Sequence, residues 1–344
     1  MLFLPMGIIR IEKRKRKRKR RTKMKKRIFW FSTIVLLIVS LMFNSVAFAC
    51  GGGKGKGGPP EGKGPGGPVV STEWLANNIK KGNLVIIDIR SEEEYQAGHI
   101  EGSINIPYIV PFSAWLTMED DLLLEMPEKE DLFDFMSAAG LKKGSHVVIV
   151  TSLPTPENPY AIGNANRAAN TLIYAGVEKV SILDGGFDKW AAEGRFVTTE
   201  VPDVRPSKYK SKVKDEMIVS MEYVEKKLGK VILLDARDYE VYTGEVIEPY
   251  APVPGHIPTA KSLPAPEIWN EDWSYKSVNE LKAIVENVIG RNKQNKEIIV
   301  YCGVGGYANC VAFVLTEMLG YKNVKIYDGS AQEWSKYNEM VVGE

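Results

Sequence analysis

The chain has 344 residues, of which 44% are hydrophobic and 26% are charged, so its bulk is not disordered and its length is enough for two domains. Residues 1–49 hold 14 of the 45 Lys and Arg but one of the 43 Asp and Glu, which leaves the chain from Cys50 on with a formal charge of −11. This acidic body argues against nucleic acid as a partner, because phosphate binding needs a basic surface. The three cysteines, Cys50, Cys302 and Cys310, are too few for a disulfide scaffold, and no Cys-x-x-Cys pair or other cluster suggests a metal site.

The N-terminus has the features of an export signal. Residues 13–27 contain 13 Lys or Arg, and the uncharged, apolar stretch from Ile28 to Phe43 follows directly. A basic n-region ahead of an apolar h-region is typical of such signals, and Met24 offers an alternative start. The basic run is interpreted as orienting the signal, with binding of nucleic acid or anionic lipid as the alternative. We therefore expect the body to lie on the periplasmic or extracellular side.

The end of the signal leaves three alternatives open. Residues 47–49, Ala-Phe-Ala, have the small-x-small pattern of a cleavage site, whereas Cys50 invites a lipoprotein interpretation although the residues before it depart from a lipobox. Cleavage with release, lipid attachment at Cys50 and an uncleaved anchor are all consistent with this pattern, and the last two would tether the protein to a membrane. Residues 50–68 are dominated by Gly, Pro and Lys, which predicts a flexible spacer.

The body contains an internal repeat with five landmarks in the same order. The landmarks of the first copy are Asp88-Ile-Arg90, Gly98-His-Ile100, Val147-Val-Ile-Val150, Gly163-Asn-Ala-Asn166 and Asp184-Gly-Gly186 with Trp190, and those of the second are Asp235-Ala-Arg237, Gly255-His-Ile257, Ile298-Ile-Val-Tyr301, Gly306-Tyr-Ala-Asn309 and Asp328-Gly-Ser330 with Trp334. The repeat predicts two domains, residues 69–200 and 215–344, joined by a Pro-containing linker at residues 201–214.

Each copy alternates short Val, Ile and Leu runs with helical stretches. In the second copy, apolar residues recur at helical spacing over residues 278–289, just before the apolar run 298–301, and residues 132–139 show the same pattern in the first copy. Such alternation favours an α/β fold in which each copy forms a mostly parallel sheet flanked by helices.

The strongest candidate for chemistry is Cys302. It follows a predicted strand, and a glycine-rich turn and a predicted helix over residues 309–319 come after it. Open α/β sheets bind ligands at the carboxyl ends of their parallel strands, which is where Cys302 is predicted to lie. Because Gly303, Gly305 and Gly306 lack a Cβ, the loop can curl so that its N–H groups converge on one point. Such a nest, with the helix N-terminus, would lower the thiol pKa from about 8.5 toward about 3.5–7.5 and make Cys302 a nucleophile.

The alternative for Cys302 is a buried free cysteine, which is common in protein cores. The repeat favours the nucleophile, because the equivalent position in the first copy is Thr151, which leads into a Pro-rich loop at residues 153–159. One copy therefore has a thiol and a tight loop, and the other has neither.

Taken in this order, the landmarks resemble the rhodanese family, specifically its tandem-domain sulfurtransferases, over about residues 70–342. The resemblance implies that the first domain is catalytically silent and that Cys302 attacks the outer sulfur of a small-molecule donor such as thiosulfate. The resulting persulfide would pass its sulfur to a thiophilic acceptor such as cyanide or a thiol, by ping-pong catalysis without a cofactor. The predicted persulfide and anion loop consists of Gly303, Val304, Gly305, Gly306, Tyr307 and Ala308, with backbone N–H groups of residues 303–307 holding the negative charge.

Departures from the family pattern leave the donor open. No side chain of the loop is charged, the Ser or Thr positions typical of 3-mercaptopyruvate enzymes are absent, and Val241 stands where tandem enzymes often have Arg. Thiosulfate is the predicted donor, with 3-mercaptopyruvate-type use as an alternative. A second hypothesis is a non-enzymatic sulfur carrier or binding module.

The remaining candidates are assigned structural roles. The repeated Asp-x-Arg pairs are expected to be internal braces, with Arg237 as a further candidate for an anion contact, and Tyr307 is expected to pack. The histidines of the two Gly-His-Ile motifs, His99 and His256, are expected to form structural hydrogen bonds, and His146 to lie on the surface. Cys310 is expected to be buried, with a resolving thiol as the alternative. A cysteine phosphatase is excluded, because residues 303–310 contain no phosphate-clamping Arg.

Overall fold

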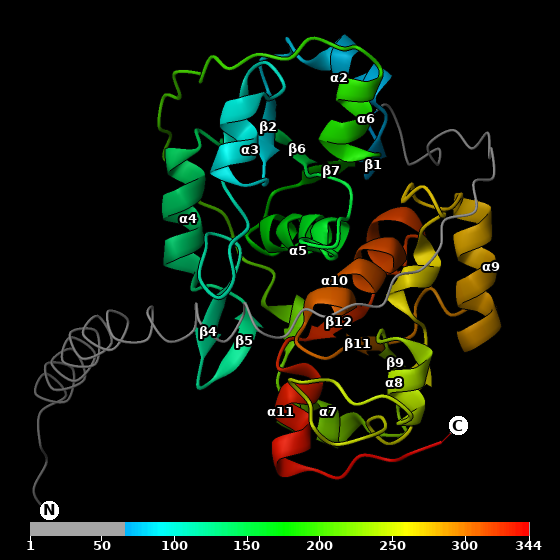
Figure 1. The fold of residues 1–344 in the computed structure, drawn as a ribbon. Coiled ribbons are helices and arrows are strands. Elements are labelled where there is room, and N and C mark those ends of the chain that lie inside the picture. Colours follow the sequence, from blue (N-terminus) through cyan, green and yellow to red (C-terminus); the bar gives the residue numbers. More distant parts are fainter. Residues whose placement is uncertain (1–65, 344) are drawn as a thin grey trace, which may run out of the picture. The chain divides into compact units, whose positions relative to one another are not determined.

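The computed structural model describes residues 66–343, and the first half of this region is built on a five-stranded parallel sheet (Figure 1). Across the sheet the strands are β1 (Val69–Val70), β7 (Lys179–Leu183), β6 (His146–Val150), β2 (Leu84–Asp88) and β3 (Ser103–Asn105). Its helices are α2 (Thr72–Asn78), α3 (Glu92–Ala97), α4 (Lys129–Ala138), α5 (Ala161–Tyr174) and α6 (Gly186–Ala192). A two-stranded antiparallel hairpin, β4 (Thr117–Glu119) and β5 (Leu122–Glu125), interrupts this pattern.

The second half repeats the topology of the first. Its parallel sheet has the order β8 (Ile218–Val219), β12 (Val324–Tyr327), β11 (Ile298–Tyr301), β9 (Ile232–Asp235) and β10 (Lys261–Ser262). Its helices are α7 (Met221–Lys227), α8 (Tyr239–Thr243), α9 (Val278–Ile289), α10 (Gly306–Phe313) and α11 (Ser330–Tyr337), with 3₁₀ turns at Asp215–Met217 and Ala265–Ile268. Each strand takes the place of its counterpart in the first sheet, so the predicted α/β fold with an internal repeat is confirmed.

Local sequence explains where several of these helices begin. Ser91 and Ser277 cap α3 and α9, and in each case the Glu three residues later completes a capping box. The buried residues of α9 are Leu281, Val285 and Ile289, as its helical spacing predicts. The strands β6 and β11 are buried along their whole length, which is why they read as continuous apolar runs.

The helix after Cys302 differs from its prediction. It begins at Gly306 rather than Asn309, because Gly305 adopts a left-handed conformation (φ +87°) that turns the chain directly from the loop into the helix. Its regular part ends at Phe313, and a π-helical turn, Val314–Met318, follows where an uninterrupted helix to Leu319 was expected. The catalytic candidate is thereby brought closer to the helix N-terminus than the sequence suggested.

The two halves pack through α5 and α10, which lie side by side (Figure 1). Asn170 of α5 donates a buried hydrogen bond to the carbonyl of Asn309 at 2.8 Å, and Tyr275 donates to the Asn166 side chain at 3.0 Å. One cluster of buried apolar residues runs through both halves, including Ile149 of β6 and Val300 of β11. The loop after Cys302 therefore lies beside the first half.

The segment between the two halves has no regular secondary structure. Residues 201–214 form no helix or strand, and Tyr209 within them is buried, donating to the Ala175 carbonyl at 3.2 Å. The predicted signal and Cys50 lie outside the described residues, as does most of the predicted spacer. Within residues 66–343, no helix has both the length and the apolar character needed to cross a membrane.

Candidate active site

Cys302 lies directly after β11, at the carboxyl edge of the second sheet, as predicted. The side chain is buried, with 3% of the residue exposed, and the thiol is free. The Gly305 N–H donates to Sγ at 3.1 Å, and the amides of Val304 and Ala308 also favour the ionised thiol. The loop therefore forms a nest of N–H groups around one sulfur atom, in which Val304 and Gly305 belong to the predicted residues 303–307 and Ala308 lies outside them.

The predicted low pKa of Cys302 is contradicted by this environment. Burial, together with the negative charge of Glu248, outweighs the loop amides and raises the pKa of the thiol to about 11. The prediction was wrong because it considered the amides of the loop but not the loss of water around the sulfur. At pH 7 such a thiol is almost entirely protonated.

The N-terminus of α11 holds the Cys302 loop from one side. The amides of Ala331 and Gln332 donate to the carbonyls of Cys302 and Gly303, each at 2.9 Å. The Ser330 hydroxyl accepts from the Cys302 N–H at 3.2 Å and donates to the Tyr327 carbonyl. Ser330 has φ +53°, a conformation that strains a residue with a Cβ and is held here by these hydrogen bonds. The Asp-Gly-Ser landmark is visible in the sequence, but this function of Ser330 is not.

Arg237 forms the internal brace that was expected for the Asp-x-Arg motif. Its guanidinium pairs with Asp235 and donates to the Gly255 carbonyl at 2.7 Å, and the side chain is 2% exposed. Its Nη1 faces the Glu248 carboxylate at 3.6 Å. Because carboxylates occupy both sides of this cation, the geometry supports the brace; whether Arg237 also contacts an anion stays a prediction.

Glu248 is a residue of the site that no motif in the sequence indicated. It lies in the insertion that lengthens the second copy between Arg237 and Gly255, and its carboxylate is packed on Gly303. A Cβ at Gly303 would stand 2.6 Å and 2.8 Å from the two carboxylate oxygens, so a larger residue there would displace the Glu248 carboxylate from the loop. Its Oε2 is buried without a hydrogen-bond partner, and burial raises the pKa of this carboxyl. No local pattern identifies such a contact, since it depends on how the insertion folds back.

A second unpredicted contribution comes from Arg167 of the first half. This fully buried side chain, on α5, forms an ion pair with Asp328 and donates to the Leu124 carbonyl of β5. The Met126 N–H donates to the other Asp328 oxygen at 2.7 Å. Asp328 precedes α11, and Gly305 lies against both Asp328 and Arg167. The half without a cysteine thus supports the loop that carries one.

The other predicted side chains take the following places. His99 and His256 are buried and bond backbone carbonyls through Nδ1, at 2.9 Å and 3.0 Å, so their structural role is confirmed. The surface prediction for His146 was wrong: it is buried at the start of β6, with Nε2 2.8 Å from Ser181 Oγ, because the adjacent elements cover it. Cys310 is buried and free, and Tyr307 packs against Tyr160 with ring centroids 5.8 Å apart.

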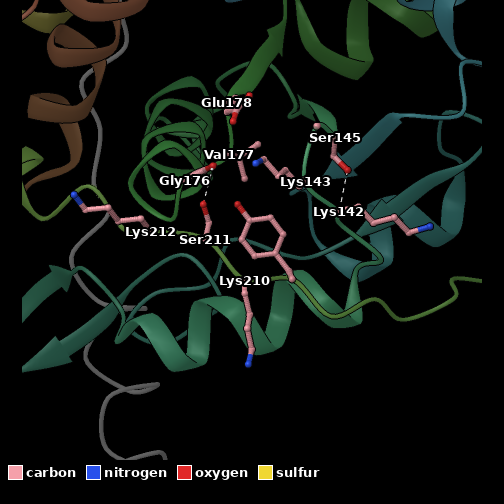
Figure 2. Close-up of a pocket in the computed structure, with 11 residues that line it drawn as sticks. Lys142, Lys143, Ser145, Gly176, Val177, Glu178, Lys210, Ser211 and Lys212 are labelled. Carbon is pink, nitrogen blue, oxygen red and sulfur yellow. Dashed lines mark hydrogen bonds between the residues drawn. The ribbon is translucent and has the colours of Figure 1, made fainter.

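Two of the cavities in the described part of the chain are bounded by the first half and the linker. One, of about 620 Å³, is bounded by Arg90, Tyr108 and Thr151, at the edge that corresponds to Cys302. The other, of about 220 Å³, is bounded by lysines and the linker, and Figure 2 shows the ammonium groups of Lys142, Lys210 and Lys212 pointing away from one another. These lysines do not converge on one anion. In the described residues, no three His, Cys, Asp or Glu side chains are placed to hold a metal ion.

The fold and site define a class: a tandem α/β protein with one buried thiol in a nest of amides. Comparison with known proteins agrees with this class. The family model of the rhodanese-like domain matches twice, at residues 71–193 and 220–337. The chain belongs to the rhodanese family.

Three similar proteins show which activities are named among the relatives of this chain. The chain is 32% identical to "Sulfur carrier protein TtuD" of Thermus thermophilus over 77% of its own length and 93% of the relative. It is 29% identical to a protein of Mycolicibacterium smegmatis named "Putative thiosulfate sulfurtransferase", over 79% and 95% of the two chains. The crystal structure of SseA from Escherichia coli, described as a 3-mercaptopyruvate sulfotransferase, superposes with a TM-score of 0.62 at 28% identity, covering 77% and 98%. The relatives that match most of this chain are therefore named as sulfurtransferases or as a sulfur carrier.

Proposed function

We propose that this chain is an exported sulfurtransferase whose Cys302 carries sulfur as a persulfide, with thiosulfate as donor and cyanide or a thiol as acceptor. The observation that carries the proposal is the Cys302 sulfur, which accepts a hydrogen bond from Gly305 at the carboxyl edge of the sheet while Thr151 occupies the equivalent place. The names of the relatives support the reaction class. Export rests on the N-terminal sequence, and the protein is either released or tethered through its N-terminus or Cys50.

The reaction takes place in two steps. In the first, the Cys302 thiolate attacks the outer sulfur of thiosulfate, the S–S bond of the donor breaks, and sulfite leaves with its electron pair. In the second, the acceptor attacks the outer sulfur of the persulfide, and the Cys302 thiolate leaves. The amides of Val304, Gly305 and Ala308 stabilise the negative charge on the sulfur in both steps.

Steady-state formation of thiocyanate from thiosulfate and cyanide tests this proposal. We expect Cys302→Ala to reduce the rate to the background without protein, because no other described cysteine lies in the loop. Cys310→Ala is the matched control, and it should keep most of the activity. Intact mass after thiosulfate treatment should increase by one sulfur atom in the parent protein and not in Cys302→Ala. A parent rate no higher than that of Cys302→Ala would remove the enzymatic proposal.

A non-enzymatic sulfur carrier is the second candidate, and it is supported by the uncharged loop, by Val241 and by the name of the Thermus thermophilus relative. A carrier would gain the sulfur atom in the mass measurement yet show no turnover with small acceptors. The two measurements together therefore distinguish an enzyme, a carrier and a protein that does not handle sulfur.

A further inference from the structure

The surface next to Cys302 is acidic and aromatic. Glu248 lies on the loop at Gly303, and its negative charge acts on both the Cys302 thiol and the Tyr160 hydroxyl. Tyr160 is 58% exposed, and its ring packs on Tyr307 of the loop. The negative charge of Asp238 acts on the Tyr307 hydroxyl. We call Glu248, Asp238, Tyr160 and Tyr307 the acidic rim.

Charge and burial indicate what kind of molecule suits the acidic rim. The loop has no charged side chain, and the nearby cation, Arg237, pairs with Asp235 and also faces Glu248, whose Oε2 lies 3.6 Å from its Nη1. Asp235 and Asp238 also act on Glu248, so one cation faces three carboxylates and the negative charge of Glu248 still reaches the Cys302 thiol. An ammonium group supplies the opposite charge, and the faces of aromatic rings also attract cations.

We propose that Glu248 selects sulfur acceptors that carry a positive charge, such as an aminothiol, over anionic acceptors. This inference rests on the proposed function, because it concerns the second step of the same reaction. The acceptor thiolate attacks the outer sulfur of the protonated persulfide, Cys302–S–SH. The S–S bond breaks, Cys302 leaves as a thiolate, and the acceptor departs as R–S–SH, so atoms and charges balance.

Glu248 acts on the transition state through its charge. The attacking thiolate is negative, and a carboxylate beside it opposes the approach of a further negative group. An ammonium group two carbons from the attacking sulfur instead places a positive charge near Glu248 while the reaction occurs. Only such a difference between acceptors in the transition state changes their relative rates.

The experiment compares three thiols of similar size: cysteamine with an ammonium group, 2-mercaptoethanol without charge, and 3-mercaptopropionate with a carboxylate. The full chain is loaded with inorganic polysulfide, the persulfide is quantified by intact mass, and single-turnover discharge is followed at low salt. Rates are expressed per thiolate, which removes the differences in thiol pKa. Loading with polysulfide makes this test independent of thiosulfate as donor.

We expect the parent protein to prefer cysteamine over 3-mercaptopropionate, and Glu248→Gln to lower this ratio by about ten-fold. Glu248→Lys should reverse the preference. Glu245→Gln, which removes an exposed carboxylate of the same insertion, is the matched control and should leave the ratio unchanged. An equal ratio in the parent protein and Glu248→Gln overturns the proposal even when the persulfide forms, whereas failure of Cys302 to load counts against the proposed function.

Discussion

The two halves share one topology but differ at the edge where their central strands end. In the first half, Thr151 donates to the Ala161 carbonyl at 3.1 Å, and a cavity of about 620 Å³ opens beside it. In the second half, Cys302 lies in a nest of amides under Glu248 and is 3% exposed. The sheet therefore positions the residue at the strand end, and the loops and insertions around that residue determine which chemistry it can perform.

The two sites also share contacts that different residues make in each half. Phe187 donates its N–H to the Thr151 carbonyl at 2.8 Å, as Ala331 does to Cys302. The residue before it is Gly186 in the first half and Ser330 in the second, with φ +58° and +53°. A Cβ at Gly186 would approach the Thr151 carbonyl to 2.2 Å, whereas Ser330 uses its side chain to hold the Cys302 amide. The arginine of each Asp-x-Arg motif also has a different neighbour: Arg90 packs on the Phe187 ring, and Arg237 faces Glu248.

The contact between the halves should have the largest effect on stability. Arg167→Met leaves the Asp328 carboxylate buried without its cation, and breaking such a pair costs about 3–5 kcal/mol of unfolding free energy. Denaturant unfolding measures this loss. Arg195→Met, in the more exposed pair with Glu193, is the control and should cost at most about 1 kcal/mol. Equal losses in the two variants would mean that the halves do not depend on Arg167.

Gly305→Ala should disrupt the nest while leaving the nucleophile in place. Gly305 has φ +87°, and an added Cβ would stand 3.1 Å from the Asp328 carbonyl. We expect a loss of about 1–2 kcal/mol in stability and at least about a ten-fold slower formation of the persulfide, measured by mass against time. Gly229→Ala is the control, because Gly229 also has a positive φ (+69°) but has open space around its Cβ. It should lose stability and keep its rate.

The pH dependence of Cys302 alkylation tests the effect of burial. Because the pKa is raised, the reactive thiolate is scarce at neutral pH, and the rate should rise about ten-fold per pH unit from pH 7 toward pH 10. Glu248→Gln removes a negative charge and should shift this profile to lower pH, while Glu245→Gln should not. Iodoacetamide labelling, read at Cys302 by peptide mass, provides the rates. A half-maximal rate near pH 8.5 or below would contradict the burial described here.

Thr151→Cys should have the smallest effect. The variant places a thiol at the equivalent edge of the first half, but the Pro-rich loop that follows lacks the glycine-lined turn of the second. We expect no additional sulfur atom by intact mass when Thr151→Cys is combined with Cys302→Ala. A persulfide on the introduced thiol would show that the position at the strand end is sufficient without the nest.

Much of this molecule could be predicted from local patterns. The repeat and the parallel sheets were identified from the paired landmarks, the apolar runs of β6 and β11 and the spacing of α9. This was possible because the periodicities of strands and helices appear in the local sequence. The position of Cys302 followed from the same patterns. The early start of α10 was missed, since it depends on the left-handed turn at Gly305.

The amino-acid sequence by itself established where the thiol lies, which half carries it and that glycines surround it. The folded molecule alone decided that Glu248 covers the loop, that Arg167 of the other half braces Asp328, and that the thiol is harder to ionise than its loop suggests. The reason is physical: hydrogen-bond donors within a few residues are visible in a local pattern. Loss of water and approach of distant charges depend on segments that meet only when the chain folds.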